Sequence, residues 1–157
     1  MKKAILLVFI VLFNLSGYAQ SNDNHLLGKW KIVTFDAMLY HDYRNDSTHY
    51  PPELLESLKG NKDSAFMVGF LDGMISSFKN YYYEFQAKDK FLEIKNGSIK
   101  QNGTYIINKK EKTILLMVKD KSGGENRQTL LYELKDNHLL LSIPSDEMPI
   151  TIGLVKE

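Results

Sequence analysis

The sequence predicts an all-β protein: an eight-stranded antiparallel up-and-down β-barrel with a two-helix insertion between the first and second strands. The segment 26–35 alternates its side chains with the period of two that is typical of a strand. From Tyr81 onward, further short β-prone segments are separated by turn sequences such as Asn96-Gly97. Eight strands close a barrel small enough to be filled by its own side chains or to hold one small ligand.

The later strands are rich in aromatic and β-branched residues and are bounded by turn residues. They are expected at 81–86, 91–95, 104–107, 113–118, 128–134, 138–143 and 150–156. Asn102-Gly103 follows Asn96-Gly97 too closely to bound a full strand, so we expect a bulge or bend there. Several segments, such as 114–118, are apolar on both faces, and a β-sandwich explains that pattern nearly as well as a barrel.

Between the first strand and the later ones, the sequence predicts a polar connection and then two helices. The connection covers residues 36–49. The segment 50–60, the first predicted helix, has prolines near its start and a glycine at its end. A second helix is expected over 63–78. Gly69 and Gly73 make this helix intrinsically weak, so packing has to hold it in place.

Residues 1–19 have the organisation of a cleaved secretory signal. Lys2 and Lys3 precede an apolar segment, and small residues before Ala19 suit a signal peptidase. We expect cleavage after Ala19, with Gln20 as the alternative, and a single domain over 20–157. The sequence has no cysteine, so no lipid can be attached behind the signal. This predicts an exported, soluble protein of the periplasm or the extracellular space, not a lipoprotein.

The charge balance excludes several classes of partner. The chain has 20 Lys and Arg against 19 Asp and Glu, for a formal net charge of +1. Nucleic-acid binding needs a concentrated basic surface, which this composition does not provide. No segment of the mature chain has the length and hydropathy of a membrane span. A protein partner is not indicated by any motif.

Gly28-Lys29-Trp30 resembles the Gly-x-Trp signature that begins the first strand of lipocalins and the wider calycin group. Gly103-Thr104-Tyr105 and Leu139-Leu140-Leu141 resemble the middle strand and the closing hairpins of secreted bacterial lipocalin-like domains. The resemblance implies that Trp30 plugs one end of the barrel, under a basic side chain of the last strand. Lys156 is in phase for that position, where the family usually has Arg. Two helices after the first strand resemble the portal lid of fatty-acid-binding proteins, which are also calycins.

Aromatic and methionine side chains gather on the second predicted helix and on the strand that follows it. They form either an apolar pocket under a helical lid, with methionine adapting its shape, or a plug of core side chains in the barrel mouth. The candidate ligand-binding residues are Phe66, Phe70, Met74, Phe78, Tyr81, Tyr83 and Phe85. Because residues spaced by four share a helix face, we expect Phe66, Phe70, Met74 and Phe78 to point inward together.

No pattern in the sequence indicates catalysis, a metal or a cofactor. His41, Asp42 and His49 match no ligand spacing, and we interpret them as part of a solvated polar loop. There is no nucleophile elbow and no phosphate-binding glycine loop. The predicted function is therefore non-catalytic binding of a small apolar molecule outside the cytoplasm. The alternative is a filled-barrel protein-interaction or inhibitor module without a small-molecule ligand.

Overall fold

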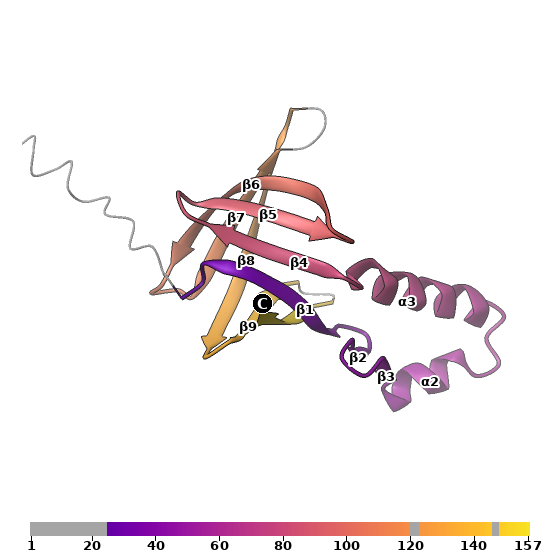
Figure 1. Cartoon of the computed structure of the whole chain (residues 1–157). Helices are drawn as coiled ribbons and strands as arrows, with labels where there is room; N and C mark the ends of the chain where they lie inside the picture. Colours follow the sequence, from indigo (N-terminus) through magenta and orange to yellow (C-terminus); the bar gives the residue numbers. More distant parts are fainter. Residues whose placement is uncertain (1–24, 120–122, 146–147) are drawn as a thin grey trace, which may run out of the picture.

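The computed structural model describes residues 25–119, 123–145 and 148–157 (Figure 1). The predicted signal, 1–19, lies outside these residues. Eight strands form a closed antiparallel barrel in which each strand pairs with the next and the last pairs with the first. In barrel order they are β1 (Gly28–Asp36), β4 (Tyr81–Gln86), β5 (Lys90–Lys95), β6 (Ser98–Asn108), β7 (Thr113–Lys119), β8 (Glu125–Lys135), β9 (His138–Ile143) and β10 (Ile150–Lys156). The structure therefore confirms the predicted closed barrel and excludes the alternative β-sandwich.

The predicted connection at 36–49 is wrong, because this segment forms two short strands. They are β2 (Tyr40–Asp42) and β3 (Ser47–His49), and the two helices follow β3 instead of following β1 directly. One edge of β1 pairs with β4 through its first residues and with β2 through its last, Thr34–Asp36. Strand β2 thus occupies the edge of β1 that β4 leaves free. Asp46 has a positive φ of 53° in the turn between β2 and β3, a conformation that Asp tolerates better than most residues.

The turn at Asn96-Gly97 has the expected positive φ at both residues, 51° and 75°. The irregularity predicted at Asn102-Gly103 instead falls a few residues earlier. Glu93 pairs with Gln101 while Ile94 pairs with Ile99, so β6 accommodates one extra residue, Lys100. Gly103 itself lies in a regular part of β6, and an added Cβ there would lie 2.1 Å from the Met117 carbonyl oxygen. The glycine is needed for this close approach of two strands, not for a bend.

The core extends from the end of the barrel where β1 begins and β10 ends to the helix side of β1, where Phe35, Leu39, Leu71 and Ile152 are also buried. Large side chains on the inner face of almost every strand are fully buried there, and each contributes about 1.5–3 kcal/mol through the hydrophobic effect. Those at most 2% exposed include Trp30, Phe85, Phe91, Tyr105, Ile114, Leu130, Leu139 and Leu154.

The helices form an arm that projects from the barrel (Figure 1). This helical arm comprises α2 (Pro52–Leu58), which has no buried residue, and α3 (Ser64–Phe78), in which Leu71 alone is buried. The end of α3 is attached to the barrel: the Phe78 ring stacks on Phe35 at 5.1 Å, and the Tyr43 hydroxyl donates a hydrogen bond to the Ile75 carbonyl. Among the described residues, no helix has both the length and the apolar character needed to cross a membrane.

The inward stripe predicted for α3 is wrong for two of its four members. Phe66 is 77% exposed and Phe70 is 48% exposed. Steps of four residues turn by about 40° more than a full circle, so three such steps rotate a stripe about 120° around the helix. The side chains of α3 that contact the core instead combine steps of three and four: Met67, Leu71, Met74, Ile75 and Phe78.

Candidate functional site

One end of the barrel is closed by Trp30. This side chain is fully buried, its Nε1–H donates to the Leu26 carbonyl oxygen at 2.7 Å, and the Nζ of Lys156 lies 5.3 Å from the ring centroid. Lys156 pairs with Trp30 across β1 and β10, and its ammonium donates to the His25 carbonyl oxygen. Gly28 has a φ of 126°, and an added Cβ would lie 2.8 Å from the Lys156 Cε. Glycine at position 28 therefore leaves room for the lysine stem to reach the tryptophan.

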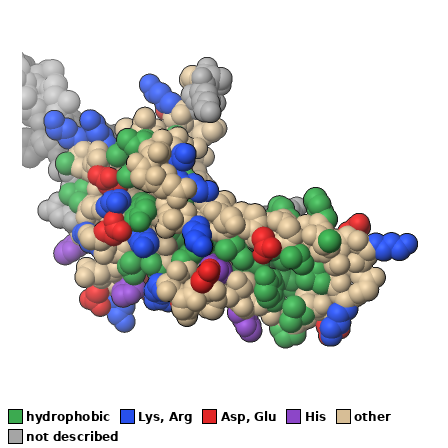
Figure 2. All heavy atoms as spheres, turned by 45° about the vertical axis from the view of Figure 1, so that its right-hand side comes forward, with side chains coloured by type: hydrophobic (Ala, Val, Ile, Leu, Met, Phe, Trp, Pro, Cys, Tyr) green, Lys and Arg blue, Asp and Glu red, His purple; other side chains and the backbone are tan. Residues whose placement is uncertain are grey.

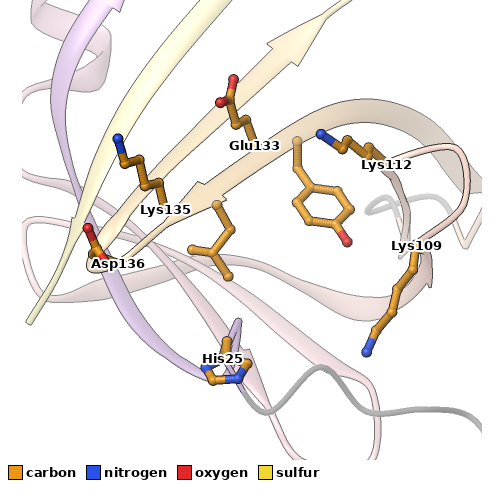
Figure 3. A pocket seen from close by; sticks show the side chains of 8 residues that line it. His25, Lys109, Lys112, Glu133, Lys135 and Asp136 are labelled. Atoms are coloured by element: carbon orange, nitrogen blue, oxygen red, sulfur yellow. The ribbon is translucent and has the colours of Figure 1, made fainter.

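A surface pocket of about 640 Å³ lies at the same end (Figure 3). Its lining comes from the segment before β1, the turn between β6 and β7, and the end of β8, with both signs of charge. The charged or titratable members are His25, Lys109, Lys112, Glu133, Lys135 and Asp136, around Tyr132 and Leu134. Three lysines and two carboxylates do not favour a purely apolar ligand, and we do not place one there.

At the opposite, helix-side end of the barrel, inward-facing side chains of β8 are exposed to solvent. Residues of β8 that pair with buried inner-face residues of β7 also face inward: Gln128 pairs with Leu116, and Asn126 pairs with Val118. Both Asn126 and Gln128 are nevertheless exposed. We call the inward-facing surface at this end the barrel mouth.

One wall of the barrel mouth is a continuous series of aromatic rings. It starts at Phe78, at the end of α3, and continues to Tyr81 at 6.0 Å and Tyr83 at 5.9 Å. Tyr83 then meets Phe91 edge-on at 5.3 Å. The floor below is made by Phe85, which contacts both Phe91 and Tyr105. A series of aromatic rings therefore leads from the end of α3 into the packed interior.

A carboxylate interrupts this aromatic wall. Glu93 lies on β5, two positions beyond the inward-facing Phe91, and pairs with Tyr83 of β4. Its carboxylate accepts a hydrogen bond from the Tyr81 hydroxyl at 2.5 Å. Burial raises the pKa of the Glu93 carboxyl, and the hydrogen bond from Tyr81 opposes that shift. Burial likewise raises the pKa of the Tyr81 and Tyr83 hydroxyls, so both phenols are neutral near pH 7.

The closed meander of eight antiparallel strands and the Trp30–Lys156 contact between first and last strands decide the architecture. The barrel is lipocalin-like.

No protein-family model and no curated protein matches the sequence. Solved structures that are similar to this chain at low identity include the following three. A DUF4847 family protein from Bacteroides vulgatus is 14% identical with a TM-score of 0.49, covering 86% of this chain and 96% of its own. A lipocalin-like protein from Bacteroides uniformis is 15% identical with a TM-score of 0.46, covering 85% and 100%. An uncharacterized protein from Bacteroides eggerthii is 14% identical with a TM-score of 0.44, covering 84% and 99%.

The lipocalin-like barrel brings some of the seven candidate ligand-binding residues together and separates the others. Phe78, Tyr81 and Tyr83 line the barrel mouth, and Phe85 lies buried in the floor. Met74 packs half-buried at the base of α3. Phe66 and Phe70 lie on the exposed surface of the helical arm, away from the other five. Glu93 was not among the candidate residues. The available signal was the alternation of Phe91, Glu93 and Lys95, which places Glu93 on the same strand face as Phe91.

His41 and Asp42 are not part of a solvated loop, as the sequence predicted, but are 2% and 8% exposed in the β2–β3 hairpin. The Nδ1 of His41 shares a 2.8 Å hydrogen bond with the Thr48 hydroxyl, and Arg44 binds both oxygens of Asp42. That pairing lowers the pKa of Asp42 to about 2. Within the described ranges, no group of three His, Asp or Glu side chains is placed to hold a metal ion. The Asp42 carboxylate and the His41 Nδ1 therefore have local partners within the hairpin, whereas the His41 Nε2 is buried without a hydrogen bond, 3.6 Å from an Asp46 carboxylate oxygen.

Proposed function

We propose that the protein binds a small, largely apolar molecule in the barrel mouth, without catalysing a reaction on it. The observation that carries this proposal is the aromatic wall from Phe78 to Phe91, which ends at a mouth where the inward-facing Gln128 is exposed. Ligand sites are concave, mostly aromatic surfaces with a few polar groups, and Glu93 and Gln128 are polar groups of that kind. Non-catalytic binding is also the role that a lipocalin-like barrel would suit.

In this proposal the helical arm is not a lid. Only the last residues of α3 contribute to the wall, through Phe78, and the Phe78–Phe35 stack fixes them to β1. The ligand would enter beside the arm and contact Tyr81 and Tyr83. Phe66 and Phe70 would make no contact with it.

The test uses a bulky residue placed inside or outside the mouth. Gln128→Trp fills the mouth without removing any buried side chain, and Thr129→Trp adds the same bulk to the next, outward-facing position. Titration with the neutral fluorescent probe N-phenyl-1-naphthylamine should show binding to wild type and Thr129→Trp, and at least about tenfold weaker binding to Gln128→Trp. Equal binding by all three proteins, or none by wild type, would rule out the mouth as the site.

The natural ligand can be sought in the same material. Protein purified from its own source under native conditions is extracted with solvent, and the extract is analysed by mass spectrometry. A compound recovered in stoichiometric amount from wild type and absent from Gln128→Trp would identify the ligand class.

A second candidate function, binding of a protein partner, is favoured by one observation. The helical arm exposes Leu55, Phe66, Val68 and Phe70, and Figure 2 shows hydrophobic side chains gathered over it. Along α3 the only charged residue is Asp72, so an apolar protein surface is the chemistry that this face fits. A photoreactive residue at position 66 or 70 should then cross-link one defined protein in cells, and the same residue at Glu133 should not. Phe70→Ser should remove that cross-link and leave probe binding unchanged.

A further inference from the structure

We propose that the ligand of the barrel mouth carries a basic amine on its apolar body, and that the Glu93 carboxylate receives the ammonium group. This inference rests on the proposed function and adds the chemical class of the ligand.

Glu93 lies at the inner boundary of the barrel mouth. Its neighbour across the strands is Tyr83, and Tyr83 is 8% exposed. The carboxylate is therefore held at the height where the open mouth meets the packed interior, with Phe91 below it. A molecule that enters from the helix side reaches Glu93 before it reaches the aromatic floor.

The Glu93 carboxylate has no positively charged partner in the described part of the chain. Tyr81 is the one hydrogen-bond partner of the carboxylate in the described part of the chain, and no lysine, arginine or histidine there forms an ion pair with it. Lys95 is two positions further along β5, but its ammonium donates to the Ser76 carbonyl oxygen at 3.4 Å. On the β6 side, Glu93 pairs with Gln101, which is uncharged. The titratable groups near Glu93 are thus two neutral phenols and Lys95, which bonds elsewhere, and the partly buried carboxylate has no ion-pair partner among the described residues.

Two aromatic rings of the neighbouring strand β4 lie beside Glu93: Tyr83 pairs with it, and Tyr81 donates to it. The face of an aromatic ring attracts an ammonium group. A ligand ammonium would therefore gain both a charge-assisted hydrogen bond and cation–π contacts. A ligand carboxylate or phosphate would meet the opposite situation, because two negative charges at short range repel each other.

The test compares three ligands of equal length: octylamine, 1-octanol and octanoate. Each displaces N-phenyl-1-naphthylamine from the protein at pH 7. For wild type, octylamine should compete about tenfold better than octanol, and octanoate should compete least. In Glu93→Gln, the advantage of the amine over the alcohol should disappear. Glu133→Gln removes a carboxylate at the opposite end of the barrel and should behave like wild type.

The outcomes separate this inference from the proposed function. If octanol competes as well as octylamine for wild type, the mouth binds apolar molecules but the amine assignment is wrong. If octanoate competes best, it is wrong as well. If neither the probe nor any octyl compound binds, both proposals fail together. The comparison of ligands on wild type decides the question even where Glu93→Gln folds poorly.

Discussion

Replacing Trp30 by alanine should remove the closure of the barrel and cost about 3–5 kcal/mol of unfolding free energy, the range typical for a fully buried tryptophan. Part of this cost comes from the cavity, and part from the Leu26 carbonyl, which loses the indole N–H as its donor. A domain of this size has about 5–15 kcal/mol of stability in total. With a denaturant slope of about 2 kcal/mol per molar urea, the unfolding midpoint should fall by roughly 2 M.

Two further variants divide this cost into its parts. Trp30→Phe keeps a ring in the core but leaves the buried Leu26 carbonyl unsatisfied, so it should cost about 1–3 kcal/mol. Lys156→Met keeps the stem beside Gly28 and removes the ammonium over the ring, which should cost about 0.5–1 kcal/mol. Urea unfolding is followed by circular dichroism, because Trp30 is the one tryptophan in the sequence. The reasoning is refuted if Trp30→Ala costs under about 1 kcal/mol, or less than Lys156→Met.

Three further predictions concern the rest of the molecule. On α3, Leu71→Ala should cost about 2–5 kcal/mol and Phe66→Ala under about 0.5 kcal/mol in urea unfolding, and equal costs would contradict the assigned helix face. Gly103→Ala should prevent stable folding by clashing with Met117, whereas Gly69→Ala, with open space around it, should raise stability by about 0.4–1 kcal/mol. Because Arg44 holds the pKa of Asp42 at about 2, below the usual 3.8, the pair stabilises the fold above pH 4 and its contribution is lost as the pH falls through 2. Asp42→Asn should flatten that part of the stability profile, and an unchanged profile would contradict the pairing.

The closed end of the barrel was predictable because short-range rules determine it. Alternation puts Trp30 and Lys156 on inner-face positions of their strands, and closure of the barrel pairs the first strand with the last. Period and topology place Lys156 beside the start of β1, whereas the position of Trp30 as the end plug was implied by the resemblance to the Gly-x-Trp signature. The turn at Asn96-Gly97 was also predictable, because these two residue types favour the positive φ values that the turn requires.

The β2–β3 hairpin was not predictable by the same rules, because its residues are polar. A segment with His41, Asp42 and Arg44 has no apolar alternation, and its burial depends on side-chain pairs that form only after the turn at Asp46 closes. Helix α3 shows a different limit. It is apolar on several faces, so its sequence allowed more than one inner stripe. The contacts of α3 with the barrel, among them the Phe35–Phe78 stack and the Tyr43–Ile75 hydrogen bond, select one.

Glu93 supports the proposal that the barrel mouth is the binding end of this protein. An apolar residue at position 93 would complete the wall between Phe91 and Tyr81 and would avoid the cost of desolvating a carboxylate. Alternation places Glu93 on the same strand face as Phe91, but it does not say whether this face or the face of Leu92 and Ile94 points inward. The pairing of Glu93 with Tyr83 answers that question. Packing alone would favour an apolar residue at position 93. Polar residues that cost stability in this way are expected at sites where a protein binds a ligand. At the other end, by contrast, the Trp30 N–H and the Lys156 ammonium both have partners within the chain.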